Sequence, residues 1–131
     1  MSEYSELLKD PRWQKKRLKI MERDNFQCQI TFEKDKTLCV HHKKYIKGKK
    51  PWEYANKDLI TITDEEHTAM HIVLSENSSF FRFMSEVLKC TPTDVFILLY
   101  RTSKIVKIEG KNGIKTAIQL LTAYVIKQEE M

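Results

Sequence analysis

The stretch Leu-Cys-Val-His-His-Lys-Lys-Tyr, residues 38 to 45, runs from apolar residues through two adjacent histidines into a basic segment. Its apolar half is typical of a short β-strand, and the basic loop that follows, residues 43 to 51, has no helical period. Neighbouring side chains on a strand point to opposite faces. His41 and His42 are therefore not expected to bind one ion together, and one ring can bind while the other stays free.

A second pair of histidines follows a short β-branched run, residues 59 to 62. Thr63 to Glu66 form a capping box, which predicts that a helix begins immediately before His67. His67 and His71 are four residues apart and so lie on one face of that helix. Together with one imidazole from the strand end, they would complete a three-histidine metal site with open positions for water or phosphate.

An open metal position beside an unligated histidine is the arrangement that phosphodiester hydrolysis requires. The free imidazole, whose pKa lies near neutrality, can take a proton from the attacking water. The ion polarises the phosphoryl oxygen and stabilises the charge on the departing oxygen. The four histidines therefore predict a small nuclease site, in which the free ring faces an open cleft lined by lysines.

Local signals outside these pairs predict the remaining elements of the N-terminal half. Asp10 and Pro11 form a helix start, and the apolar period after them predicts a helix over residues 11 to 23. Two short extended pieces, near residues 26 to 32 and 37 to 41, flank a polar turn and form a candidate hairpin. Three aromatic residues are interpreted as core anchors, namely Trp13, Trp52 and Tyr54.

Beyond residue 75 the pattern predicts helices only. Residues 77 to 79 can cap one helix, and Thr91 to Asp94 form a second capping box. A last apolar stripe is interpreted as core or as a dimer interface, and it consists of Ile114, Ala117, Ile118, Leu121 and Val125. The chain is therefore predicted to be α+β, with a core over residues 1 to 74 that includes an N-terminal helix. An all-helical extension over residues 75 to 131 would pack on this core or form a homodimer interface.

Composition and charge narrow the class of protein. The chain has 131 residues, of which 41% are hydrophobic and 31% charged, as is typical of one folded domain. Its net charge of +5 is concentrated in residues 1 to 50, which hold fourteen Lys and Arg against seven Asp and Glu. Such a bias suits the phosphate backbone of a nucleic acid, although a solvated lysine face would give the same pattern. The lysines of the basic loop are Lys43, Lys44, Lys47, Lys49 and Lys50.

The sequence also carries an expectation about location. The N-terminus lacks a basic region followed by an apolar stretch, and no apolar run comes near the roughly 20 residues that a membrane span needs. Cys28, Cys39 and Cys90 are odd in number and lack a paired spacing, which predicts free thiols. We therefore expect a cytoplasmic protein that does not enter a membrane.

A set of residues between about positions 4 and 74 has the order and spacing of a known family. Its members are Pro11-Arg12-Trp13, Arg17, Ile20, Arg23-Asp24, Cys28-Gln29, Val40-His41-His42, Pro51-Trp52-Glu53-Tyr54, Leu59-Ile60-Thr61, His67 and His71. With this set the chain resembles the HNH endonucleases, which have the ββα-metal fold. The resemblance implies a ββα-metal core, His42 as the general base, and His41, His67 and His71 as the ligands of one divalent ion.

Two features depart from the pattern of that family. Many relatives hold a structural zinc with two Cys-x-x-Cys pairs, and the matching positions here are Cys28, Thr31, Thr63 and Glu66. With one cysteine among four positions, no structural zinc is expected. The middle letter of the family motif is an asparagine, and its register holds Asp58, with Asn56 two residues earlier. Either Asp58 substitutes for it or Asn56 takes the role through a shifted loop.

The expected function is that of a metal-dependent HNH endonuclease that hydrolyses phosphodiester bonds of DNA, with RNA left open as a substrate. Three imidazoles favour zinc, nickel or manganese over magnesium in affinity, and any of the four could be the working ion. The expected nucleic-acid contacts are Lys43, Lys44, Lys47, Lys49, Lys50 and Arg17. The alternative is a catalytically impaired HNH-derived module that binds nucleic acid or a protein as an inhibitor or adaptor. A phage, another mobile element or a defence system would suit a small free-standing nuclease.

Overall fold

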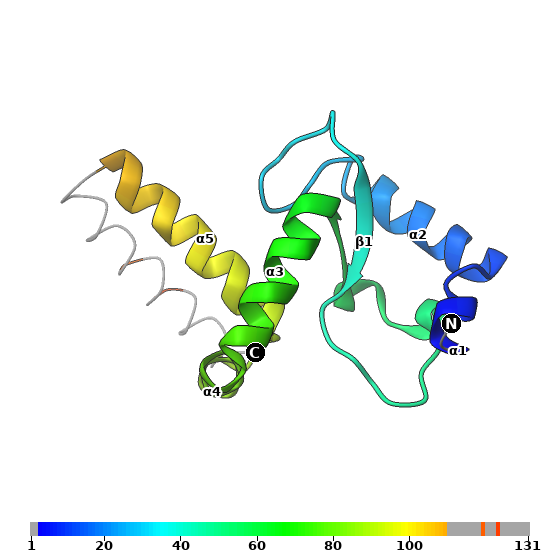
Figure 1. The fold of residues 1–131 in the computed structure, drawn as a ribbon. Helices are drawn as coiled ribbons and strands as arrows, with labels where there is room; N and C mark the ends of the chain where they lie inside the picture. The colour runs from blue at the N-terminus through cyan, green and yellow to red at the C-terminus, as the bar shows by residue number, and fades with distance from the viewer. Residues whose placement is uncertain (1–2, 110–118, 120–122, 124–131) are drawn as a thin grey trace. The chain divides into compact units, whose positions relative to one another are not determined.

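The protein is described by a computed structural model that covers residues 3 to 109 together with residues 119 and 123 (Figure 1). It divides into two compact units, Met1–His71 and Ile72–Met131, whereas the boundary expected from the sequence lay after residue 74. The first unit contains α1 (Glu3–Leu7), α2 (Pro11–Arg23), β1 (Leu38–His42), the 3-10 turns η1 (Pro51–Glu53) and η2 (Asn56–Asp58), and β2 (Leu59–Thr63). Three further helices follow, α3 (Asp64–Glu76), α4 (Ser78–Leu88) and α5 (Pro92–Glu109). Helices and one small antiparallel sheet make the described part of the chain α+β, as predicted.

Helix α2 begins at the predicted residue because its first turn is capped. The Asp10 carboxylate accepts the backbone N–H of Arg12 at 2.8 Å, and Pro11 occupies the first helical position, where no N–H is needed. The helix ends at Arg23, as predicted, and it buries Trp13 and Ile20. These two side chains fix which face of the helix meets the sheet.

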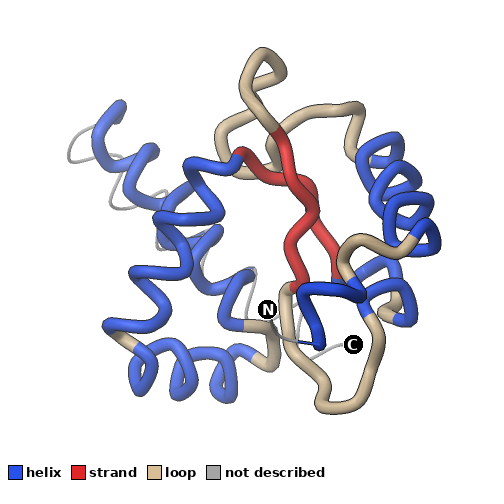
Figure 2. Tube along the Cα trace, turned by 45° about the vertical axis from the view of Figure 1, so that its right-hand side comes forward, coloured by secondary structure: helices blue, strands red, loops and turns tan. Residues whose placement is uncertain are grey.

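The sheet consists of β1 and β2, which pair antiparallel from Leu38 opposite Thr63 to His42 opposite Leu59 (Figure 2). The residues between the strands therefore form one long loop, whose ends are joined by a hydrogen bond from the Lys43 N–H to the Asp58 carbonyl at 2.8 Å. The basic loop, residues 43 to 51, therefore begins at the end of β1, directly after the two histidines.

The predicted hairpin between residues 26 to 32 and 37 to 41 is wrong. The first of these segments is a turn, closed by a hydrogen bond from the Phe32 N–H to the Cys28 carbonyl at 2.8 Å. Phe26 and Phe32 both have left-handed backbone, with φ of 50° and 64°, which an extended strand does not permit. The partner of β1 is β2 instead.

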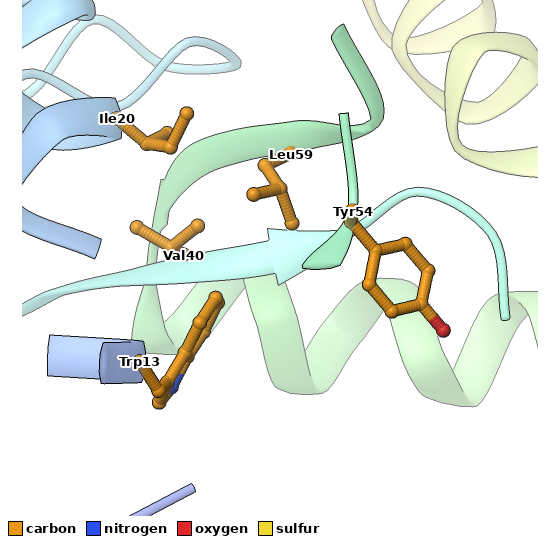
Figure 3. Packing of buried hydrophobic residues seen from close by; sticks show 5 residues of the cluster. All are labelled: Trp13, Ile20, Val40, Tyr54 and Leu59. Carbon is orange, nitrogen blue, oxygen red and sulfur yellow. The ribbon is translucent and has the colours of Figure 1, made fainter. Parts of the chain in front are cut away.

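The hydrophobic core of the first unit lies between α2 and one face of the sheet. Figure 3 shows its five buried members, Trp13, Ile20, Val40, Tyr54 and Leu59. Val40 comes from β1 and Leu59 from β2, while the 3-10 region supplies Tyr54, which is 1% exposed. A two-stranded sheet is only marginally stable alone, and the burial of these side chains supplies the additional stability. Trp13 and Tyr54 are core anchors, as the sequence predicted, and Trp52 packs against the cluster while partly buried.

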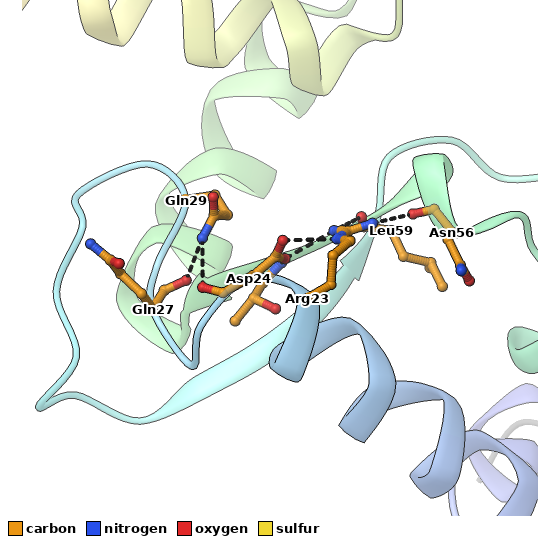
Figure 4. A network of polar contacts seen from close by, with 7 residues as sticks. Arg23, Asp24, Gln27, Gln29, Asn56 and Leu59 are labelled. Atoms are coloured by element: carbon orange, nitrogen blue, oxygen red, sulfur yellow. Dashed lines mark hydrogen bonds and ion pairs between the residues drawn. The ribbon is translucent and has the colours of Figure 1, made fainter.

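A polar network joins the end of α2 to the sheet (Figure 4). The guanidinium of Arg23 pairs with both carboxylate oxygens of Asp24, at 2.8 and 2.9 Å, and also donates to the carbonyls of Asn56 and Leu59, at 2.6 and 2.8 Å. Asp24 accepts the N–H of Thr61 in β2 at 3.0 Å. Burial alone would raise the pKa of the Asp24 carboxyl, but the hydrogen bonds from Arg23 and Thr61 outweigh it and lower the pKa. Asp24 therefore remains charged and ties three segments together.

Helix α3 follows β2 without a loop because Thr63 caps it. The Thr63 hydroxyl accepts the Glu66 N–H at 3.1 Å, and Asp64, Glu65 and Glu66 place negative charge in the first turn. The predicted helix start and its threonine cap are thus confirmed. The helix carries His67 in its first turn and His71 one turn later.

The second unit has its own core, formed by Phe81, Leu88 and Val95. Helix α5 starts as predicted, because the Thr91 hydroxyl accepts the Asp94 N–H at 3.2 Å and Asp94 accepts the Thr91 N–H at 3.1 Å. The predicted last stripe, from Ile114 to Val125, lies outside the described residues. The homodimer that it suggested stays a prediction. In the described part of the chain, no helix is both long and apolar enough to cross a membrane.

Candidate functional site

Three histidines lie together where β1 ends and α3 begins. The ring of His41, on β1, is 5.2 Å from that of His67 and 5.4 Å from that of His71, and the two helix rings are 4.5 Å apart. Each ring offers one nitrogen, and the three nitrogens all lie within 4.8 Å of one another. The predicted convergence of these side chains is confirmed, and they could hold a metal ion.

The surroundings of this cluster favour neutral imidazoles. Burial, with a further contribution from positive charge on His67 and His71, lowers the pKa of His41 to about 3. Burial also lowers the pKa of His67, again with a contribution from His71. A histidine must be neutral to bind a metal, so the lowered pKa values of His41 and His67 favour the form that a ligand requires.

The donor set fits a divalent ion of borderline hardness. The Nε2 atoms of His67 and His71 are 2.9 Å apart, so that one donates a hydrogen bond and the other accepts it. Two ligands of a tetrahedral zinc at standard bond lengths are about 3.3 Å apart, and a small side-chain movement would therefore open this pair enough. His41 is buried, His67 half-buried and His71 exposed, so the cluster is open to solvent on one side.

His42 lies on the other side of β1. Its ring stacks on Trp13, with centroids 4.8 Å apart, and meets the edge or face of Tyr54 at 4.6 Å. Its Nε2 atom is 3.1 Å from the carbonyl oxygen of Pro51. Since a carbonyl only accepts, Nε2 carries the proton of the neutral ring, and Nδ1 is the basic nitrogen. The prediction that His41 and His42 point to opposite sides is confirmed.

The packing around His42 differs from the open, lysine-lined cleft that the sequence suggested, because Trp13 and Tyr54 leave this ring half-buried. Burial lowers the pKa of His42, and the hydrogen bond to Pro51 offsets part of that effect. The Pro51 carbonyl was not predicted as a partner of His42. Every residue carries such a group, so no side-chain pattern could have indicated it.

The two candidates for the asparagine role have different environments. Asp58 is 7% exposed, and its carboxylate lies 3.6 Å from the ammonium of Lys44. Its carbonyl receives the Lys43 N–H, so Asp58 ties the end of the long loop to the end of β1. Asn56 has an exposed side chain, and its carbonyl accepts from Arg23. The buried position that joins loop and strand is thus that of Asp58.

Several lysines of the basic loop already have contacts within the protein. The ammonium of Lys49 is 5.6 Å from the ring centroid of Tyr54, and that of Lys50 is 5.8 Å from the centroid of Trp52. Lys47 is exposed. Five of the eight residues from 43 to 50 are nevertheless lysines, and they give this segment a dense positive charge.

Arg17, the remaining predicted contact, lies on α2, away from the basic loop in sequence. It is half-buried, and its guanidinium donates to the side chain of Gln14 at 2.7 Å. Arg12, earlier on the same helix, contacts the loop instead, with its guanidinium 4.2 Å from the ring centroid of Trp52. The carboxylate of Asp10 pairs with that guanidinium at 3.0 Å.

The four positions that match a structural zinc site form two hydrogen-bonded turns. The Sγ of Cys28 accepts the Thr31 N–H at 3.4 Å, and the Thr63 hydroxyl accepts the Glu66 N–H. Burial would raise the pKa of Cys28, but hydrogen bonds from Thr31, Ile30 and Thr63 outweigh it and lower the pKa. The Gln29 N–H donates to the Thr61 carbonyl at 2.9 Å, so the first turn lies beside β2, the strand that leads into the second turn.

Comparisons with protein-family profiles, with curated proteins and with solved structures found no match to this chain. The resemblance to HNH endonucleases therefore stays an expectation from the sequence.

Proposed function

We propose that the protein is a metal-dependent endonuclease of the HNH type that hydrolyses phosphodiester bonds in DNA. One observation carries the proposal: a single strand sends His41 into a three-histidine cluster and His42 to its opposite face, where one nitrogen is left basic. Metal-assisted hydrolysis needs both a ligand set and a separate base. The chain provides the two from adjacent residues.

In this proposal His41, His67 and His71 hold one divalent ion, which supplies Lewis-acid stabilisation of negative charge on the phosphoryl and departing oxygens. His42 acts as the general base. Its Nδ1 takes a proton from a water molecule, the water oxygen forms the new bond to phosphorus, and the bond to the 3′ oxygen breaks. A 5′-phosphate remains on the other fragment.

The protein side of this chemistry is the orientation of His42. The hydrogen bond to Pro51 fixes its tautomer, and the stack on Trp13 fixes the plane of its ring. The lowered pKa keeps the ring unprotonated at neutral pH, as a base must be. Asp58 fills the asparagine role by tying the loop to β1, and the lysines of the loop contact the phosphate backbone.

The second candidate function is a binding module derived from such a nuclease, serving as an inhibitor or adaptor. It is favoured by the half-buried ring of His42 and by the contacts that Lys44, Lys49 and Lys50 make within the chain. In that case nucleic acid or a protein would bind without being cleaved.

Plasmid cleavage separates the two functions. Supercoiled DNA is incubated with the purified protein and Mg²⁺, Mn²⁺, Ni²⁺ or Zn²⁺, beside His42→Ala and His42→Phe variants purified identically. Phe keeps a ring against Trp13 but lacks Nδ1. The proposal expects nicked or linear product from the parent only. Intact plasmid with every ion would rule out the nuclease function, and equal cleavage by His42→Phe would rule out His42 as the base.

A further inference from the structure

Tyr45 is an aromatic residue in the middle of the basic loop, and its side chain is largely in solvent. It is 70% exposed, the highest value among the exposed large hydrophobic residues in the described part of the chain. Its ring meets that of Tyr4 edge to face, with centroids 5.9 Å apart and planes at 68°. Most of the Tyr45 ring therefore remains open to a ligand.

The backbone that carries Tyr45 is anchored on both sides. Two residues before it, the Lys43 N–H bonds to Asp58 at 2.8 Å. Immediately after it, Ile46 gives its N–H to the Tyr54 hydroxyl at 2.9 Å and accepts from that hydroxyl at 3.4 Å. Tyr54 is fully buried, so the loop is held to the core at this point. An aromatic ring on a held backbone loses little further conformational freedom when a ligand binds.

The charges beside Tyr45 indicate what such a ligand would be. Lys43 and Lys44 precede it and Lys47 follows it in the sequence, so the exposed ring belongs to a segment of dense positive charge. The ammonium of Lys44 is 3.6 Å from the Asp58 carboxylate, whereas Lys47 is exposed. Lysines along a groove or loop, with an aromatic ring among them, are the combination that binds single-stranded nucleic acid. The lysines contact phosphates and the ring stacks on a base. A ring cannot reach a base face inside an intact duplex, where the bases stack on one another.

We propose that Tyr45 stacks on an unpaired base, and that the substrates of this protein are DNA strands with unpaired bases close to the cleaved phosphate. The inference deepens the proposed nuclease function and rests on it, because DNA is a substrate only if the protein cleaves it. Stacking at Tyr45 is nevertheless a statement about binding, which is measurable without cleavage. His42 is three residues before Tyr45, so the stacked nucleobase would lie near the proposed general base, His42.

Binding is measured by fluorescence anisotropy in EDTA, which prevents metal-dependent cleavage. The probes are a labelled single strand of DNA and the duplex formed from it. The proteins are the parent, Tyr45→Ala, Tyr45→Phe and Lys47→Ala. We expect Tyr45→Ala to weaken single-strand binding by about tenfold or more and duplex binding by less than about twofold, while Tyr45→Phe retains parental binding. Lys47→Ala should weaken binding to both probes alike and reduce the salt dependence.

Equal losses on the two probes, an unchanged affinity for the single strand in Tyr45→Ala, or no single-strand binding by the parent would overturn the inference. Far-ultraviolet circular dichroism confirms that each variant is folded. Failure of the proposed function looks different: the parent binds the single strand through Tyr45 but cleaves neither probe when metal is added.

Discussion

His41 and His42 are adjacent on β1, yet their rings lie on opposite sides of the strand. His41 faces His67 and His71, whereas His42 stacks on Trp13 and bonds to Pro51. Two neighbouring residues of one type thus have separate sets of partners. Substitutions can therefore test the proposed metal ligands and the proposed general base separately.

Replacement of His67 by Ala should abolish or strongly weaken metal binding, since it removes one of three nitrogens. The loss should exceed the roughly 10- to 100-fold that follows removal of an outer-shell partner. Replacement of His42 by Phe should leave metal affinity unchanged and end DNA cleavage. Isothermal titration with Zn²⁺ or Ni²⁺ measures the first effect and plasmid nicking the second. If His42→Phe lost metal as His67→Ala does, the assignment of three ligands would be wrong.

The metal-free protein should become less stable as the pH falls. The pKa of His41 is lowered to about 3, below the value of about 6.5 in an unfolded chain, so the unfolded state takes up the proton first. The stability that His41 contributes is present above pH 6.5 and is lost between pH 6.5 and pH 3. Between pH 7 and pH 5 this loss amounts to about 2 kcal/mol.

Urea unfolding in EDTA at pH 7 and pH 5 measures that change. The matched variant is His41→Gln, which cannot take up the proton and should show a smaller fall in its free energy of unfolding. His42 and His67, whose pKa values are also lowered, remain in both proteins and contribute equally. The same pH dependence in parent and variant would contradict the assignment to His41.

The Asp24→Asn variant should lose about 1–2 kcal/mol of stability, because the buried Asp24 would lose its charged hydrogen bonds, while the side chain of Arg23 is 40% exposed and stays in contact with water. Asparagine also offers only one oxygen, where Asp24 uses both to bind Arg23 and Thr61. The midpoint of urea unfolding measures the loss. The control is Asp10→Asn, which changes a half-buried carboxylate paired with the exposed Arg12 in the same manner. Its effect should be much smaller, since asparagine caps a helix as well as aspartate does. Equal effects of the two variants would show that burial of the Arg23–Asp24 pair adds nothing.

A variant with cysteine at positions 31, 63 and 66 should bind a zinc ion together with Cys28. Thr31 and Cys28 already form one turn, and Thr63 and Glu66 form the other. Four cysteines on such turns are the closed tetrahedral ligand set of structural zinc. The melting temperature should rise with added Zn²⁺, and the thiols should become protected from alkylation. Thiols that stay fully reactive in zinc would show that the two turns are too far apart. Thr63→Cys alone serves as the control, since it supplies two of the four ligands.

Much of the fold could be predicted because its helix starts have local signals. Asp10 and Thr63 each cap a helix through their own side chains, and both starts were located correctly. The convergence of His67 and His71 follows from helical spacing alone. These features need only a few consecutive residues, so a single sequence is sufficient to find them.

The pairing of the strands could not be obtained in this manner. Residues 26 to 32 are as apolar as a strand, and their turn depends on left-handed backbone at Phe26 and Phe32, which side chains of this type do not indicate. The partner of β1 is separated from it by sixteen residues, and a pattern search finds nearer partners first. The bond between His42 and Pro51 is hidden for a similar reason, because it uses a backbone carbonyl.

The long loop between the strands begins and ends at one hydrogen bond, from Lys43 to Asp58. Gly48, near its middle, has φ of 82° and open space around its Cα atom. Because the cost of closing a loop rises only slowly with its length, residues could be inserted at Gly48 while the strand ends stay paired. The segment can thus be exchanged as a cassette. A different loop sequence could change the nucleic-acid contacts proposed for this segment without moving the histidines.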